Sequence, residues 1–160
     1  MDKIVVRIAD YRIAEASATL VTYGLGSCVA VALYDSEKRT GGLCHIMLPS
    51  SPGDRASGNP KKFADLCFSG MLRDMQNSGC EVSRIVAKIA GGARMFDLPN
   101  KGKSFSIGER NRDAVLIELA KRRIPLIGED TGGNYGRTIE FHTGNGDMLV
   151  RSLRSETKVI

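Results

Sequence analysis

The amino-acid sequence predicts an α+β fold with layered sheets and helices. Short apolar runs of strand length dominate the first third and the end of the chain, and only two segments carry apolar residues at helical spacing. The two patterns do not alternate regularly, as they would in a doubly wound parallel sheet. With 160 residues and no internal repeat or dividing linker, the chain is expected to form a single domain over residues 1–160.

The first third of the chain is predicted to contain four strands. Residues 3–9 and 18–22 form strand-like runs that are separated by a polar, alanine-rich link. Residues 29–34 are an apolar run rich in β-branched side chains, residues 35–40 are polar turn material, and residues 43–48 return. This arrangement predicts an antiparallel hairpin.

The middle of the chain is predicted to contain the first helix and one further strand. Residues 50–60 carry the prolines and glycines that are typical of a surface loop. Apolar residues recur at helical spacing over residues 61–77, and Gly79 is well placed to end that helix. Residues 85–90 return to a strand pattern, and a second loop is expected over residues 99–104.

The last third is predicted to contain a second helix and a hairpin. Asn111 could cap this helix, which would end near Arg123 with basic residues in its last turn. Residues 125–128 form a short strand, and residues 137–141 and 148–153 are predicted to pair around an Asn-Gly turn.

Composition and charge exclude several classes of function. The net charge is +5, but the basic residues are scattered and do not form the stripe of a nucleic-acid-binding surface. No apolar stretch approaches the roughly 18 residues of a membrane span, so no membrane insertion is expected. The cysteines and histidines lack metal-ligand spacing, so no metal is expected. The four cysteines show no close pairing and no secretory signal precedes them, which predicts reduced thiols and a cytoplasmic protein.

The residues with the clearest chemical meaning are Cys28 and His45, each near the start of a predicted strand. Their midpoint lies between Ser36 and Glu37, inside the predicted turn, so symmetric pairing places them directly opposite one another. Directly opposed side chains share a face, with Cβ atoms roughly 4.5–5.5 Å apart, and a thiol beside an imidazole suits thiol acyl chemistry. A slip of one residue would separate them, and a buried structural cysteine remains the alternative.

Two glycine-containing motifs surround this pair. Residues 22–31 read Thr-Tyr-Gly-Leu-Gly-Ser-Cys-Val-Ala-Val, and residues 41–49 read Gly-Gly-Leu-Cys-His-Ile-Met-Leu-Pro. Together with residues 88–96, 107–111 and 129–134, they resemble the CheD family, the chemoreceptor glutamine deamidases of bacterial and archaeal chemotaxis. The resemblance continues in order through nearly the whole chain.

This resemblance implies a fold and a set of site residues. The family fold is a layered α/β/β sandwich, built here on mixed and antiparallel sheets with two main helices. Cys28 matches the family's nucleophile, His45 its general base and Thr22 its third catalytic member. Cys44 stands where small residues are more familiar in the family, and it places a second thiol near the site.

The implied activity is that of a protein-glutamine glutaminase, a cysteine-dependent amidohydrolase. It would convert glutamine side chains of methyl-accepting chemotaxis receptors to glutamate through a thioester on Cys28, and it could hydrolyse glutamyl methyl esters in the same way. Backbone N–H groups around Gly26 and Ser27 are the candidate oxyanion donors. No cofactor is implied. The resemblance also implies a CheC-type phosphatase as partner, so a non-catalytic adaptor that regulates this phosphatase is the alternative function.

Overall fold

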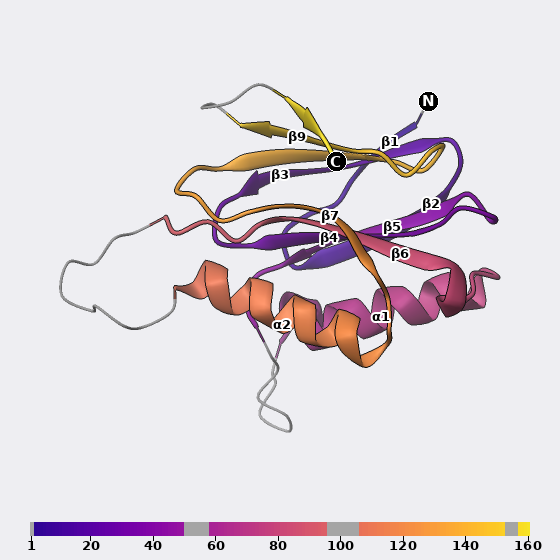
Figure 1. Ribbon diagram of the computed structural model, residues 1–160, viewed down its shortest axis with the longest axis horizontal. Helices are drawn as coiled ribbons and strands as arrows, with labels where there is room; N and C mark the ends of the chain where they lie inside the picture. Colours follow the sequence, from indigo (N-terminus) through magenta and orange to yellow (C-terminus); the bar gives the residue numbers. More distant parts are fainter. Residues whose placement is uncertain (1, 50–57, 96–105, 153–156) are drawn as a thin grey trace.

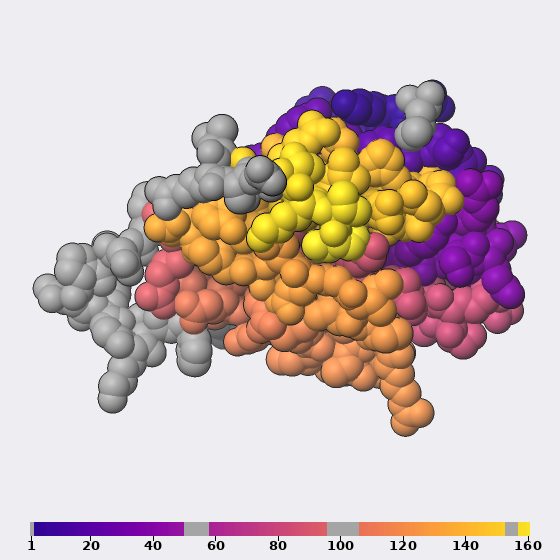
Figure 2. Space-filling view, turned by 45° about the horizontal axis from the view of Figure 1, so that its top comes forward, coloured from indigo at the N-terminus to yellow at the C-terminus, as the bar shows by residue number. Residues whose placement is uncertain are grey.

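Three layers make up the structure, a computed structural model that describes residues 2–49, 58–95, 106–152 and 157–160 (Figure 1). Two five-stranded sheets pack face to face, and two helices cover the outer face of the second sheet. The prediction of an α+β sandwich with an α/β/β layer order is confirmed. In the space-filling view, both ends of the chain (indigo and yellow) lie on the layer opposite the orange helix (Figure 2).

The first sheet contains the two ends of the described chain. Its order is β1 (Asp2–Val5), β3 (Ala18–Leu25), β8 (Arg137–His142), β9 (Met148–Ser152) and β10 (Lys158–Val159). β1 runs parallel to β3, and the other neighbours are antiparallel. The β8–β9 hairpin is confirmed, with a loop over residues 143–147.

The second sheet carries the predicted hairpin at its centre. Its order is β2 (Asp10–Glu15), β5 (Thr40–Ile46), β4 (Val29–Asp35), β6 (Ile85–Gly91) and β7 (Leu126–Thr131). β6 and β7 are parallel and are joined by α2, whereas β4 is antiparallel to both of its neighbours.

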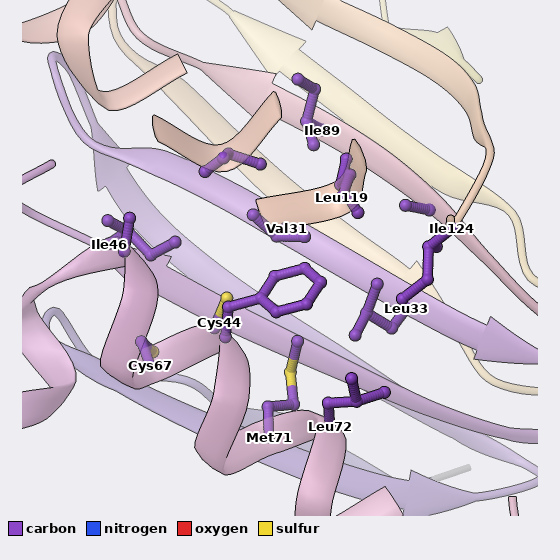
Figure 3. Packing of buried hydrophobic residues seen from close by; sticks show 14 of the residues in the cluster. Val31, Leu33, Cys44, Ile46, Cys67, Met71, Leu72, Ile89, Leu119 and Ile124 are labelled. Atoms are coloured by element: carbon purple, nitrogen blue, oxygen red, sulfur yellow. The ribbon is translucent and has the colours of Figure 1, made fainter. Parts of the chain in front are cut away.

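The helix layer is formed by α1 (Ala64–Asn77) and α2 (Ile107–Lys121), with short 3-10 turns at η2 (Pro60–Lys62) and η3 (Val82–Arg84). Val31 and Leu33 of β4 point toward these helices together with Cys44 and Ile46 of β5 (Figure 3). The alternate residues of the two strands point toward the first sheet and form a second apolar cluster. β4 is therefore buried on both faces, which accounts for its continuous apolar run.

Three predicted boundaries are corrected by the structure. Residues 10–15, predicted as a link, form the edge strand β2, because backbone pairing with β5 outweighs their polar composition. The first helix begins at Ala64, since η2 occupies residues 60–62. Asn111 does not cap α2, because Ser106 is the N-cap and its hydroxyl accepts from the N–H of Glu109.

Two predicted loops fall wholly or largely on residues that are not described. The loop over residues 99–104 lies outside the described residues, as does most of the loop over residues 50–60. No helix within the described parts of the chain is long and apolar enough to cross a bilayer.

Candidate active site

Cys28 and His45 lie on the same face of the second sheet, but they are not directly opposite. The ladder pairs Ala30 with His45, two residues beyond the predicted partner. The exact opposition predicted from the sequence is therefore wrong. A shift of two residues preserves the face, because side chains alternate with a period of two. Cys28 thus sits diagonally from His45 on the same face.

The shift originates in the turn between β4 and β5. Asp35 pairs with Thr40, so the turn is centred one residue later than a symmetric reading suggests. One oxygen of the Asp35 carboxylate accepts the N–H groups of Glu37 and Lys38 at 3.1 and 3.2 Å. Arg39 closes the turn with a φ of 45°. These local bonds fix the register.

Thr22 joins His45 across the two sheets. The Oγ1 atom of Thr22 on β3 lies 2.7 Å from Nδ1 of His45 on β5. The same hydroxyl donates to the carbonyl oxygen of Val6 at 2.7 Å. A hydroxyl has a single proton, so Thr22 must accept a hydrogen from Nδ1 of the histidine. The neutral ring therefore carries its proton on Nδ1 and leaves Nε2 as an acceptor.

Nε2 is the nitrogen of His45 that Thr22 does not engage. It is buried and has no hydrogen-bond partner among the described residues. An unprotonated imidazole nitrogen on the face that carries Cys28 can accept the proton of a thiol. Val6 was not identified from the sequence, because a backbone carbonyl leaves no signal in residue identity.

Burial sets the protonation of both groups. It lowers the pKa of His45 to about 4, and it raises the pKa of the Cys28 thiol, an effect that the backbone N–H of Cys28 opposes. At neutral pH the resting groups are thus a thiol and a neutral imidazole, which form no hydrogen bond with each other in this structure. Proton transfer then accompanies attack on a substrate, because a resting ion pair would be poorly solvated here.

The shifted histidine predicts a loss of stability in mild acid. Above pH 6.5 His45 is neutral in both the folded and the unfolded chain. As the pH falls from 6.5 toward 4, the unfolded chain binds a proton that the folded protein, with its histidine pKa of about 4, does not. Urea unfolding should therefore show about 2–3 kcal/mol less stability at pH 4.5 than at pH 7 from this residue. A His45→Gln variant should lack this part of the pH dependence, and equal slopes would contradict the assignment.

The loop that carries Cys28 is fixed through its carbonyl groups. The carbonyl oxygen of Gly26 accepts the N–H of Ala93 at 2.9 Å, and that of Cys28 accepts the N–H of Gly92 at 2.8 Å. Gly91 makes this approach possible, since its φ is 107° and a Cβ there would lie 2.3 Å from the Cys28 carbonyl oxygen. The N–H edge of the loop is thereby turned away from β6.

This arrangement bears on the predicted oxyanion donors. The N–H of Gly26 donates to the carbonyl oxygen of Gly24 at 3.1 Å and is already engaged. The N–H of Ser27 donates to no acceptor in the described part of the chain, and the N–H of Cys28 interacts there only with its own sulfur. The amides of Ser27 and Cys28 are therefore the donors of the loop that no backbone carbonyl engages.

Comparison of the sequence with known proteins assigns the chain to a family. Residues 47–152 match the family model described as CheD chemotactic sensory transduction. A protein of Syntrophomonas wolfei, named a probable chemoreceptor glutamine deamidase CheD, is 45% identical over 161 residues and covers 100% of both chains. The chain belongs to the CheD family. The resemblance found in the sequence motifs is confirmed.

Two further members of the CheD family are similar over nearly their full length, and both are also named probable chemoreceptor glutamine deamidase CheD. The relative from Moorella thermoacetica is 46% identical, over 99% of this chain and 95% of its own. The relative from Clostridium novyi is 46% identical, over 95% of this chain and 94% of its own. The family model begins after Cys28 and His45, but the full-length Syntrophomonas alignment includes both positions.

Cys44 lies apart from the site of this CheD family member. It faces the helices in the core, is fully buried, and its pKa is raised well above the usual value by burial and by a hydrogen bond with Cys67. Its side chain points away from His45, because adjacent residues of β5 face opposite sides of the sheet. Among the described residues, no group of three or more His, Cys, Asp or Glu side chains could hold a metal ion.

Proposed function

We propose that this protein is a protein-glutamine deamidase that acts on chemoreceptors through a cysteine nucleophile. The names of the relatives support the reaction and the substrate. The observation that carries the proposal for this chain is the tautomer imposed on His45 by Thr22 and Val6, which leaves a buried base on the face of Cys28. The adaptor alternative is not favoured by these names.

The proposed reaction begins with proton transfer and attack. Nε2 of His45 takes the proton of the Cys28 thiol as the sulfur attacks the carboxamide carbon of the substrate glutamine. The N–H groups of Ser27 and Cys28 are the candidate donors to the oxyanion that forms. The imidazolium then returns the proton to the departing nitrogen, and ammonia leaves a thioester on Cys28.

Hydrolysis completes the cycle. Water, deprotonated by the same imidazole, attacks the thioester carbon, and the thiol is regenerated as glutamate leaves. A glutamyl methyl ester would pass through the same thioester with methanol as the leaving group. We also propose a CheC-type phosphatase as a binding partner and the single domain over residues 1–160 as the catalytic unit, both on the resemblance to the family.

The deciding experiment weighs a receptor cytoplasmic fragment before and after incubation with the protein. Acyl transfer from nitrogen to water raises the mass by about one dalton for each converted glutamine. Mapping of the modified peptides identifies the residues. An unchanged mass together with tight binding of the phosphatase would support the adaptor alternative instead.

Thr22 is expected to contribute less than the nucleophile and the base. Thr22→Val keeps the shape of the side chain but removes both hydrogen bonds, so Nδ1 of His45 loses its acceptor. We expect kcat to fall about 10- to 100-fold with KM nearly unchanged, because orientation of the base is lost while the base itself remains. Thr22→Ser retains the hydroxyl and is the matched control. Equal activity of the two variants would exclude the orienting role.

A further inference from the structure

Asn111 is a buried polar residue with no assigned role in the reaction. It lies in the second turn of α2, is fully buried, and is not the helix cap. A buried amide must find hydrogen-bond partners or it destabilises the fold. Its partners lie outside its own helix.

Both N–H groups of the Asn111 amide reach backbone carbonyls. Nδ2 donates to the carbonyl oxygen of Ser27 at 3.0 Å and to that of Met47 at 2.9 Å. Oδ1 is buried and has no partner in the described residues. The reverse orientation would set Oδ1 against two carbonyl oxygens, so these two acceptors fix the orientation of the amide.

The two carbonyls belong to the segments that carry the nucleophile and the base. Ser27 immediately precedes Cys28, and Met47 is two residues beyond His45. Continuing the ladder past the Val29–Ile46 pair places Met47 opposite Cys28. The bridge therefore spans the two strands at the point where their own ladder ends.

The carbonyl groups on either side of Ser27, those of Gly26 and Cys28, are also hydrogen-bonded. Gly92 and Ala93, which follow β6, donate to the carbonyls of Cys28 and Gly26. α2 packs directly on them, because Gly108 has no side chain and a Cβ there would lie 2.5 Å from the carbonyl oxygens of both Gly92 and Ala93. The three successive carbonyls of residues 26–28 thus all accept hydrogen bonds, and Asn111 provides the central one.

We infer that Asn111 is a positioning residue, which sets the separation of Cys28 and His45 through its bonds to the Ser27 and Met47 carbonyls. It does not contact the reacting atoms. This role deepens the proposed function and rests on it. Without the bridge, the end of the ladder can open, and the thiol and the imidazole lose their alignment.

The test compares Asn111→Leu with Val115→Ala in the full chain. Leucine keeps the branching of asparagine at Cγ, with a larger volume, and removes both donors. Val115 lies one helical turn further along α2 and is also fully buried, but it packs in the core beneath the helices. Both variants are measured for global stability by urea unfolding, for kcat and KM on the receptor fragment, and for hydrogen exchange at the amides of Gly92 and Ala93.

Asn111→Leu is expected to lower kcat about 100-fold with KM within about twofold, since misplacement by about an ångström has effects of this size. Exchange at Gly92 and Ala93 should accelerate at least about tenfold beyond the change in global stability, whereas Val115→Ala should show only the global effect. If Asn111→Leu does not fold, Asn111→Ser, with a single donor, is measured in its place, with a smaller effect in the same direction. An effect on kcat and exchange equal to that of Val115→Ala would overturn the inference.

Hydrogen exchange separates this inference from the proposed function. If wild-type protein converts no glutamine, the proposed function fails, but faster exchange in the Asn111 variant would still establish the bridge. If wild type is active and the variant has normal kcat and exchange, the bridge fails and the proposed function stands.

Discussion

Replacing Cys28 by alanine is expected to abolish conversion of receptor glutamines while leaving the fold intact. The proposed thioester forms on this sulfur, and no step of the mechanism can proceed without it. Cys28 is 9% exposed and belongs to the second apolar cluster, which lies between the two sheets. Loss of its sulfur atom therefore removes little packing. The measurement is the mass of the receptor fragment after prolonged incubation, with circular dichroism and urea unfolding to confirm the fold.

Cys67→Ala is the matched control for this variant. Cys67 is a free, fully buried cysteine on α1, where its side chain packs with the helix-facing core and not with the site. It should lose stability by about 1 kcal/mol and retain full activity per folded molecule. Measurable conversion by Cys28→Ala above that of the buffer would contradict the nucleophile assignment.

Replacing His45 by glutamine is expected to lower kcat by about 10²–10⁴. Glutamine is neutral and polar, but its amide cannot exchange a proton with the thiol. Burial raises the pKa of the Cys28 thiol, so little thiolate exists near neutral pH without a base. The activity that remains should rise with pH as the thiol ionises on its own.

The second histidine of the chain provides the control. His142 lies at the end of β8 in the first sheet, and His142→Gln should retain wild-type kcat. Comparable losses in the two glutamine variants would indicate a general effect on folding and would exclude His45 as the base. A loss confined to His45→Gln supports His45 as the base.

The fold class could be predicted because apolar periodicity records burial. β4 is apolar from Val29 to Tyr34 since it lies between the helices and the first sheet, and α1 shows helical spacing since one of its faces packs on the second sheet. The edge strand β2 could not be predicted in this way. Its side chains are half-buried or exposed, and its strand conformation depends on backbone bonds to β5 that leave no compositional trace.

The site was predicted in part for a similar reason. The pairing of two strands was sufficient to place a thiol and an imidazole on one face, and the two-residue error did not matter because face depends only on parity. The exact register depended on how the Asp35 carboxylate binds the turn. Composition marks these residues as polar, but it does not locate the centre of the turn.

The sequence alone determined the layered α+β class and the family, and it singled out Thr22, Cys28 and His45 as candidates, because local periodicity and ordered motifs are properties of neighbouring residues. Only the tertiary structure decided how these residues are arranged. The bond from Thr22 to His45 joins two sheets, and Asn111 bridges the nucleophile loop and the end of β5 from a distant helix. Such contacts form only when separate layers pack. The histidine tautomer, its lowered pKa and the alignment of the nucleophile are therefore consequences of the packing.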